Sequence, residues 1–172
     1  MSSTARLLDR LLANEGPFID LRAPGEFLLG TVPGAVNLPL LNDEERHQVG
    51  LTYKEAGQTA AIELGESLVS GPVKAARMAA WIEFIEAHPQ AWIYCWRGGL
   101  RSRTVQDWLL EAGISVERVP GGFKALRHRC LELLESAPGA KPWLVLGGRT
   151  GTGKTVVLNQ AAGSIDLEGL AN

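Results

Sequence analysis

The stretch AWIYCWRGGLRSRTVQDWLL, residues 91–110, decides the predicted fold. Its first five residues predict a buried strand, and residues 102–112 place apolar side chains at helical spacing. The connection between them holds the pair Gly98-Gly99 together with Arg97 and Arg101. A strand that turns through such a loop directly into a helix is typical of an α/β domain, in which the loop lies at the carboxyl edge of a parallel sheet.

Strand and helix patterns alternate on both sides of this stretch. A further helix is predicted to open at Gly71-Pro72 and to end before Pro89. The other predicted elements are strands over 17–21, 35–40 and 114–119, helices over 4–13 and 121–135, and one or two short helices within 42–69. This alternation predicts an α/β fold for residues 1–135, with a mostly parallel sheet flanked by helices.

Composition narrows the function classes. The 172 residues include 17 basic and 19 acidic side chains, and the net charge of −2 excludes a uniformly basic nucleic-acid coat. Residues 97–129 are nevertheless locally basic. Two cysteines are too few for a disulfide scaffold, and no apolar run approaches the roughly 20 residues of a membrane span. With no signal-peptide pattern, the sequence predicts a cytoplasmic protein without a membrane partner.

Cys95 is the predicted nucleophile. It ends a strand and precedes the loop of glycines and arginines, where backbone amides, a helix start and two guanidinium groups favour the thiolate. The same loop would bind a phosphate-like anion beside the sulfur. The prediction requires a sulfur that solvent can reach, and the alternative is a buried strand-end cysteine next to a solvated basic loop. Cys130, on the apolar face of a predicted helix, is expected to be an inert core thiol.

A second motif lies near the carboxyl end. GRTGTGKT, residues 148–155, fits the phosphate-binding pattern G-x-x-x-x-G-K-[ST]. It has the required context, with a predicted strand over 143–148 before it and a predicted helix over 154–162 after it. Residues 136–142 predict a linker. Residues 143–172 are too few for a P-loop core, so they are expected to be the incomplete beginning of a P-loop α/β domain.

Each fixed position of this motif has an expected role. The backbone amides around Gly148, Gly151 and Gly153 would face a di- or triphosphate. Lys154 would neutralise the terminal phosphate charge, and the Thr155 hydroxyl would ligate Mg²⁺. The alternative is a flexible turn that binds nothing.

Three segments resemble rhodanese domains. FIDLRAPGEFLLGTVPGAVNLPL (18–40) is similar to their N-terminal signature, YCWRGGLRS (94–102) to their active-site loop, and VPGGFKAL (119–126) to their closing segment. The resemblance implies a rhodanese-like sheet in which Cys95 accepts a chalcogen atom, as a persulfide or its selenium counterpart. Asp20 and Arg22 would then belong to a structural motif that flanks the active site. Otherwise they form a surface ion pair near a turn.

One spacing departs from the common sulfur-transferring rhodaneses. Those domains place an arginine or its equivalent five positions after the cysteine, whereas Arg101 lies six positions after Cys95. The longer loop resembles that of dual-specificity phosphatases built on the same fold, although these have histidine where this chain has Tyr94. A simple sulfurtransferase, a cysteine-based phosphatase and a non-catalytic binding module are therefore the alternatives.

The combination of the two motifs resembles a rarer family, the tRNA 2-selenouridine synthases, and specifically their N-terminal part. The segments 43–57 and 166–172 are also similar to this family. The resemblance implies an enzyme that replaces sulfur by selenium in wobble-position 2-thiouridine of tRNA. Selenophosphate would be the donor, and geranyl diphosphate would supply an S-geranylated intermediate, so both are substrates and not resident cofactors.

The same resemblance assigns roles to the first site. It implies that Cys95 carries selenium, while Arg97, Gly98, Gly99 and Arg101 hold selenophosphate. The P-loop would hold a diphosphate that need not belong to ATP.

A tRNA ligand would also need contacts outside the loop. Trp96 would stack on a splayed base, or else pack against the following helix. Candidate phosphate contacts, each of which has a plain solvated surface residue as its alternative, are Arg103, Lys124, Arg127 and Arg129.

Overall fold

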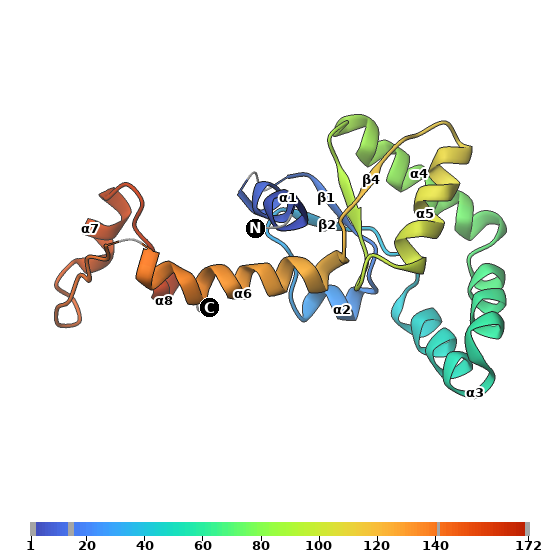
Figure 1. The fold of residues 1–172 in the computed structure, drawn as a ribbon, viewed down its shortest axis with the longest axis horizontal. Helices are drawn as coiled ribbons and strands as arrows, with labels where there is room; N and C mark the ends of the chain where they lie inside the picture. Colours follow the sequence, from blue (N-terminus) through green and yellow to red (C-terminus); the bar gives the residue numbers. More distant parts are fainter. Residues whose placement is uncertain (1–2, 14–15, 141, 171–172) are drawn as a thin grey trace. The chain divides into compact units, whose positions relative to one another are not determined.

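A four-stranded parallel sheet lies at the centre of the N-terminal part of the chain (Figure 1). In space the strands follow the order β2-β1-β3-β4. Their bounds are β1 (Phe18–Asp20), β2 (Ala35–Asn37), β3 (Trp92–Tyr94) and β4 (Glu117–Arg118). In this register Phe18 lies beside Ala35 on one side and beside Trp92 on the other. The predicted rhodanese-like parallel sheet is confirmed, although its strands are shorter than the sequence patterns indicated.

The structure is a computed structural model that describes residues 3–13, 16–140 and 142–170. The chain divides into two units, residues 1–133 and residues 134–172. Residues 1–2, 14–15, 141 and 171–172 lie outside the described residues. The predictions for the segments 1–135, 136–142 and 143–172 are therefore compared with the structure only at their other residues.

Helices connect the strands. Those that accompany the sheet are α1 (Ser3–Ala13), α2 (Pro24–Leu28), α3 (Asp43–Leu68), α4 (Gly71–Ala87), α5 (Leu100–Glu111) and α6 (Gly122–Ala140). Gly57 has a non-helical φ of 86° and divides α3 into two helical stretches, where one or two short helices were predicted. Among the described helices, none combines the length and the apolar composition needed to cross a lipid bilayer.

The two faces of the sheet bury separate apolar clusters because alternate strand residues point to opposite sides. The cluster on the face of α4 and α5 includes Ile19, Ile93, Trp81, Ile85, Val105 and Leu109. The cluster on the face of α1 and α6 includes Phe18, Tyr94, Leu8, Leu11, Phe123 and Leu126. Helices therefore cover both faces, as is usual for a parallel sheet (Figure 1).

The end of α6 differs from the sequence-based expectation. The helix continues to Ala140, so most of the predicted linker over 136–142 is helical. Proline and glycine at positions 138 and 139 lower the helix propensity, but the fixed φ of proline is compatible with a helical backbone. Composition alone therefore placed the end of this helix too early.

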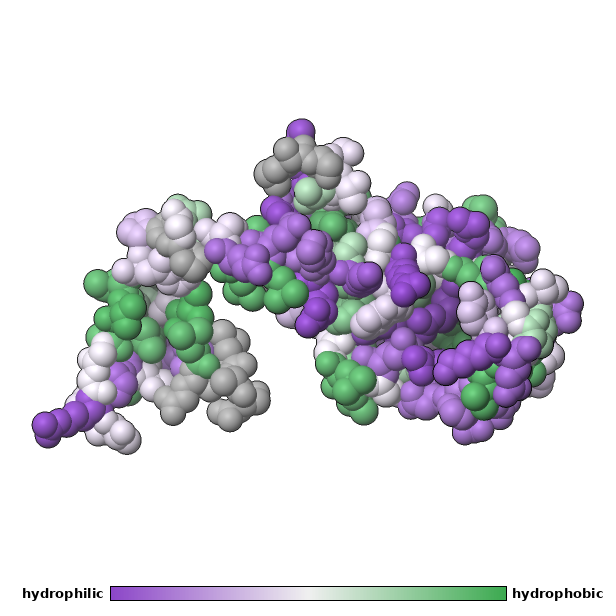
Figure 2. All heavy atoms as spheres, turned by 60° about the horizontal axis from the view of Figure 1, so that its bottom comes forward, coloured by the Kyte–Doolittle hydropathy of each residue, from purple (hydrophilic) through white to green (hydrophobic). Residues whose placement is uncertain are grey.

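The predicted strand over 143–148 is absent from the described part of the chain. Leu144 and Val145 are 100% and 87% exposed, and Figure 2 shows apolar side chains at the surface of this smaller unit. A strand needs a neighbour to accept its hydrogen bonds, and the described residues of this unit provide none. The helices α7 (Lys154–Gln160) and α8 (Leu167–Leu170) do form.

One backbone contact fixes the loop that follows β3. The amides of Phe123 and Lys124, at the start of α6, donate to the carbonyls of Cys95 and Trp96 at 2.9 and 3.0 Å. Gly122 has a φ of +61°, and a Cβ atom built there would lie 2.2 Å from the Cys95 carbonyl oxygen. Glycine is therefore required at this position.

We expect Gly122→Ala to lower the free energy of unfolding by about 2–4 kcal/mol, because the strain of a positive φ adds to the overlap with backbone atoms. Urea unfolding followed by circular dichroism measures the change. Gly50→Ala is the matched control, because Gly50 lies in α3 with open space around its added Cβ. The control should leave stability unchanged or raise it by up to about 1 kcal/mol, and equal losses in both variants would contradict the assignment.

Candidate active site

Cys95 directly follows β3 at the carboxyl edge of the sheet. Its Sγ donates a hydrogen bond to Oγ of the buried Ser102 at 3.4 Å, and that hydroxyl donates to the Gly99 carbonyl at 3.2 Å. Cys95 is only 3% exposed. The thiol is thus less accessible than the predicted nucleophile requires, and a substrate atom reaches it only when neighbouring side chains move. Its nucleophilic role stays a prediction.

The loop after Cys95 contains backbone donors that have no acceptor among the described residues. Several of its carbonyl groups are engaged, since α6 binds those of Cys95 and Trp96, and Arg118 donates to that of Gly98 at 3.2 Å. Within the described part of the chain, no amide of residues 97–102 donates to a protein acceptor. Several of these amides begin α5, where the helix dipole adds partial positive charge. The arrangement suits an anion.

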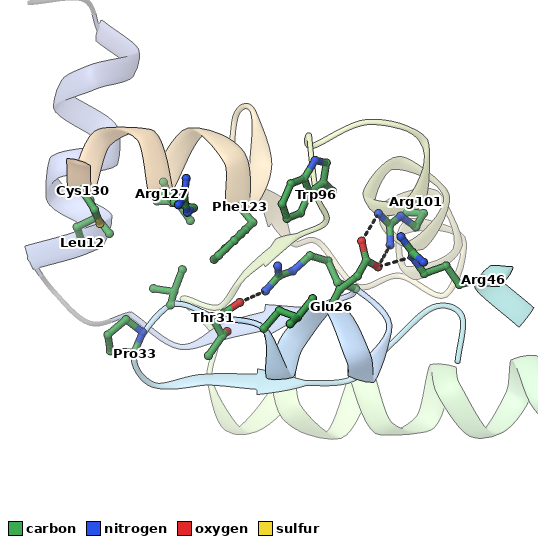
Figure 3. A pocket seen from close by; sticks show the side chains of 15 residues that line it. Leu12, Glu26, Thr31, Pro33, Arg46, Trp96, Arg101, Phe123, Arg127 and Cys130 are labelled. Atoms are coloured by element: carbon green, nitrogen blue, oxygen red, sulfur yellow. Dashed lines mark hydrogen bonds and ion pairs between the residues drawn. The ribbon is translucent and has the colours of Figure 1, made fainter. Parts of the chain in front are cut away.

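The two loop arginines are in different situations. Arg97 is exposed and has no hydrogen bond or ion pair with any described residue. Arg101 forms an ion pair with Glu26 of α2, with 2.7 Å between Nη1 and Oε2, and Glu26 also pairs with Arg46 at 3.1 Å (Figure 3). The selenophosphate role of both arginines stays a prediction, and for Arg101 the ion pair would have to loosen first.

Glu26 is a site residue that the sequence analysis missed. Its contact with Arg101 joins residues 75 positions apart, so no local sequence motif could predict it. Burial raises the pKa of Glu26, but the hydrogen bond and charge of Arg101, with help from the Ala23 amide and Arg46, outweigh burial. The pKa of this carboxyl is therefore below its usual value. Glu26 stays ionised and holds two guanidinium groups beside the loop.

Asp20 and Arg22 form a buried ion pair, so the surface-pair alternative is wrong. Both residues are 0% exposed, and Nη2 of Arg22 lies 2.6 Å from Oδ2 of Asp20. The same nitrogen donates to the Gly30 carbonyl at 2.8 Å. The guanidinium lies 3.7 Å from the ring centroid of Phe123 and 5.8 Å from that of Trp96. The pair thus supports the aromatic ring next to Cys95.

Tyr94 precedes Cys95 and points to the opposite face of the sheet. Its hydroxyl lies 3.0 Å from that of Thr31. Burial, followed by the nearby charge of Asp20, raises the pKa of Tyr94 well above its usual value. Tyr94 therefore stays protonated at neutral pH and adds no charge beside the thiol.

Two cavities border the loop. The larger cavity, of about 760 Å³, lies among α1, α2, the connection after β1, Trp96 and the first turns of α6 (Figure 3). The smaller cavity, of about 460 Å³, lies beside α3 and α5, and Arg97 belongs to its lining. Cys130 is partly exposed and lines the larger cavity, so its expected place in the core is wrong. Burial raises the pKa of the Cys130 thiol, which keeps it protonated.

The second motif has a curled backbone in the smaller unit. Gly151 and Gly153 have φ values of 82° and 79°, which favour glycine. Nζ of Lys154 donates to the carbonyls of Gly148 and Arg149, each at 3.0 Å. The predicted phosphate-binding residues are thus brought together on one turn and the start of α7. The structure tests neither the phosphate nor the Mg²⁺ assigned to them.

Comparison with known proteins identifies the fold family. A family model for the rhodanese-like domain matches residues 4–129, and the chain belongs to this family. A solved structure from Clostridium difficile 630, the N-terminal domain of a protein described as ATP/GTP binding, has a TM-score of 0.62 and 33% identity. The match covers 68% of this chain and 90% of that one.

More specific similarities cover both units. Residues 141–172 match a model described as the tRNA 2-selenouridine synthase AAA domain. A tRNA 2-selenouridine synthase from Cupriavidus pinatubonensis is 56% identical over 94% of this chain, and one from Bordetella bronchiseptica is 54% identical over 100%. The chain spans 44% and 47% of the lengths of these relatives.

Glu26→Gln is expected to lower the free energy of unfolding at pH 7. As the pH falls, the free energy of unfolding of the variant should decrease less than that of the unchanged protein. Folding depresses the pKa of Glu26, so this carboxylate stabilises the fold above its unfolded pKa of 4.5 and loses that effect as the pH falls through the lower folded value. The two proteins should differ most at neutral pH and converge in acid, as measured by urea titrations across the range. The exposed Glu83, changed to Gln, is the control. A difference that does not change with pH would argue against the ion pair.

Proposed function

We propose that this chain carries the selenium-handling half of an enzyme that replaces the sulfur of tRNA 2-thiouridine with selenium. The observation that supports it most is the loop after Cys95, which gathers a thiol with amides and an arginine, Arg97, that have no partner among the described residues. Relatives named tRNA 2-selenouridine synthase share 56% identity in an alignment long enough to include this loop and the GRTGTGKT motif.

In this proposal selenophosphate is the donor at the first site. The free amides of residues 97–102 and the guanidinium of Arg97 bind its phosphate part, and Cys95 is the nucleophile. The Cys95 thiolate attacks phosphorus, so that an S–P bond forms, the P–Se bond breaks and selenide leaves; water then hydrolyses the S–P bond and releases phosphate. The selenide attacks C2 of an S-geranylated uridine, where the C–Se bond forms, the C–S bond breaks and geranylthiol leaves. Placing the anion beside a helix start lowers the cost of bringing a charged donor to the thiol.

The second site is proposed to hold the diphosphate of geranyl diphosphate. Nζ of Lys154 would exchange the carbonyls of Gly148 and Arg149 for phosphate oxygens. The exposed hydroxyl of Thr155 would ligate Mg²⁺ beside the same diphosphate. The cation would neutralise charge on the leaving group.

A cysteine-based phosphatase is the second candidate, and the spacing of six positions from Cys95 to Arg101 favours it. A simple sulfurtransferase is a further alternative, which this spacing does not favour. The ion pair of Arg101 with Glu26 weighs against the phosphatase, because a guanidinium already neutralised by a carboxylate binds phosphate weakly. Turnover assays with thiosulfate, an aryl phosphate and selenophosphate separate these candidates. Alkylation of Cys95 separates an enzyme from a non-catalytic binding module, because only an enzyme would lose turnover.

Cys95→Ser, in a version that carries the whole P-loop domain, is expected to reduce conversion of 2-thiouridine tRNA to the selenated form by at least about 100-fold. A serine hydroxyl is a far weaker nucleophile than a thiolate at neutral pH. Mass spectrometry of the tRNA nucleosides measures the product. Normal turnover by the Cys95 variant would exclude Cys95 as the nucleophile.

Lys154→Ala is expected to weaken binding of geranyl diphosphate by about tenfold or more, because it removes a charge-assisted contact to the phosphate. Titration calorimetry gives the affinity. Lys54→Ala removes the same charge from an exposed position of α3 and should leave the affinity unchanged. Equal affinities of all three proteins would remove the P-loop from the mechanism.

A further inference from the structure

We infer that the larger cavity binds one nucleotide of single-stranded RNA, with the base on Trp96 and a phosphate on Arg127. This inference rests on the proposed function, because it assigns a place to the tRNA nucleotide that is modified. Figure 3 shows Trp96, Phe123 and Arg127 around the space that such a nucleotide would fill.

Trp96 provides a rigid aromatic surface at this cavity. It is 38% exposed, although its ring lies 5.6 Å from that of Phe123. Behind these rings lies the guanidinium of Arg22, which the buried Asp20 holds in place. Packing explains the covered part of the indole, and the exposed part remains for a base to stack on. A platform that is already ordered binds a base without losing side-chain entropy.

The charges around the cavity leave one guanidinium for a phosphate. Arg46 and Arg101 are paired with Glu26, as described above. Arg127 is exposed and has no ion pair or hydrogen bond with any described residue. It lies four positions after Phe123 in α6, so the ring and the free charge share one face of the helix. In a nucleotide the base and the phosphate are likewise held close together, because one ribose carries both.

The rest of the lining selects among possible occupants. Leu12, Val32 and Leu126 give the cavity an apolar wall that suits a base edge and a ribose. An isoprenoid chain would use this wall but would not use Arg127, and an acidic peptide would use Arg127 but offers no flat group for Trp96. The volume of about 760 Å³ is within the usual range of small-ligand sites. A nucleotide uses all three features, and Trp96 adjoins Cys95 in the chain.

The inference is tested with this chain and a short anticodon stem-loop RNA that carries photoreactive 4-thiouridine at the wobble position. After irradiation with long-wavelength ultraviolet light, mass spectrometry should locate the crosslink at Trp96 or Phe123. Fluorescence anisotropy should show roughly 5- to 100-fold weaker binding for Trp96→Ala and recovery of most of the affinity for Trp96→Phe. Circular dichroism checks that each variant is folded.

Salt dependence tests the phosphate contact. Arg127→Ala should weaken binding and should reduce the slope of log affinity against log salt by about 0.7, the value for one phosphate of a single strand. Arg10→Ala removes an exposed charge of α1 that does not line the cavity, and should change neither quantity.

The opposite results have distinct meanings. Crosslinks outside the cavity, or equal effects of the Arg127 and Arg10 variants on RNA binding, would overturn the nucleotide site. The proposed function would not be affected by either result, because the Cys95→Ser assay tests it separately. Displacement of the RNA by a geranyl-chain probe that binds normally to Arg127→Ala would show that a lipid chain occupies the cavity, and would also overturn the inference. Failure of the chain to bind the RNA overturns it as well.

Discussion

The loop after Cys95 keeps its shape because the start of α6 binds its carbonyl groups. The amides of Phe123 and Lys124 donate to two of these carbonyls, and Gly122 allows the two backbones to touch. Two of the carbonyl oxygens are turned toward α6, and the amides of residues 97–102 have no acceptor among the residues that the structure describes. The anion binding proposed for this loop would therefore depend on long-range backbone packing, with the charges of the arginines added to it.

Charged side chains around the loop divide into those that shape the site and those that are free to bind. Asp20 holds Arg22 under the aromatic rings, and Glu26 holds Arg101. Buried and partly buried pairs of this kind position groups more than they stabilise the fold, because desolvation offsets much of their attraction. Arg97 and Arg127 have no such partner among the described residues, and they line different cavities. Each of these two cavities, which border the loop after Cys95, thus has one guanidinium without a partner among the described residues.

The sequence predicted those features that depend on neighbouring residues. Periodicity gave the order of strands and helices, and the Cys95 loop was found because its residues are contiguous. The pair of Glu26 with Arg101 and the position of Cys130 at a cavity depend on contacts across the fold, so no local pattern revealed them. The burial of Cys95 was missed for the same reason. The prediction of a strand over 143–148 was wrong because an apolar run becomes a strand only beside a partner strand.

The GRTGTGKT loop and the loop after Cys95 obtain their shapes in different ways. This difference determines how well the sequence alone predicts each shape. In GRTGTGKT the contacts are local: Thr152 donates to the Arg149 carbonyl at 2.8 Å, and Lys154 bonds to carbonyls five and six positions earlier. The loop can therefore curl without a sheet around it, and its eight residues are enough to identify it. The loop after Cys95 depends on Gly122, 27 positions away, so a change in α6 can alter the site without touching the motif. The shape of the GRTGTGKT loop is accordingly easier to predict from its own residues than the shape of the loop after Cys95.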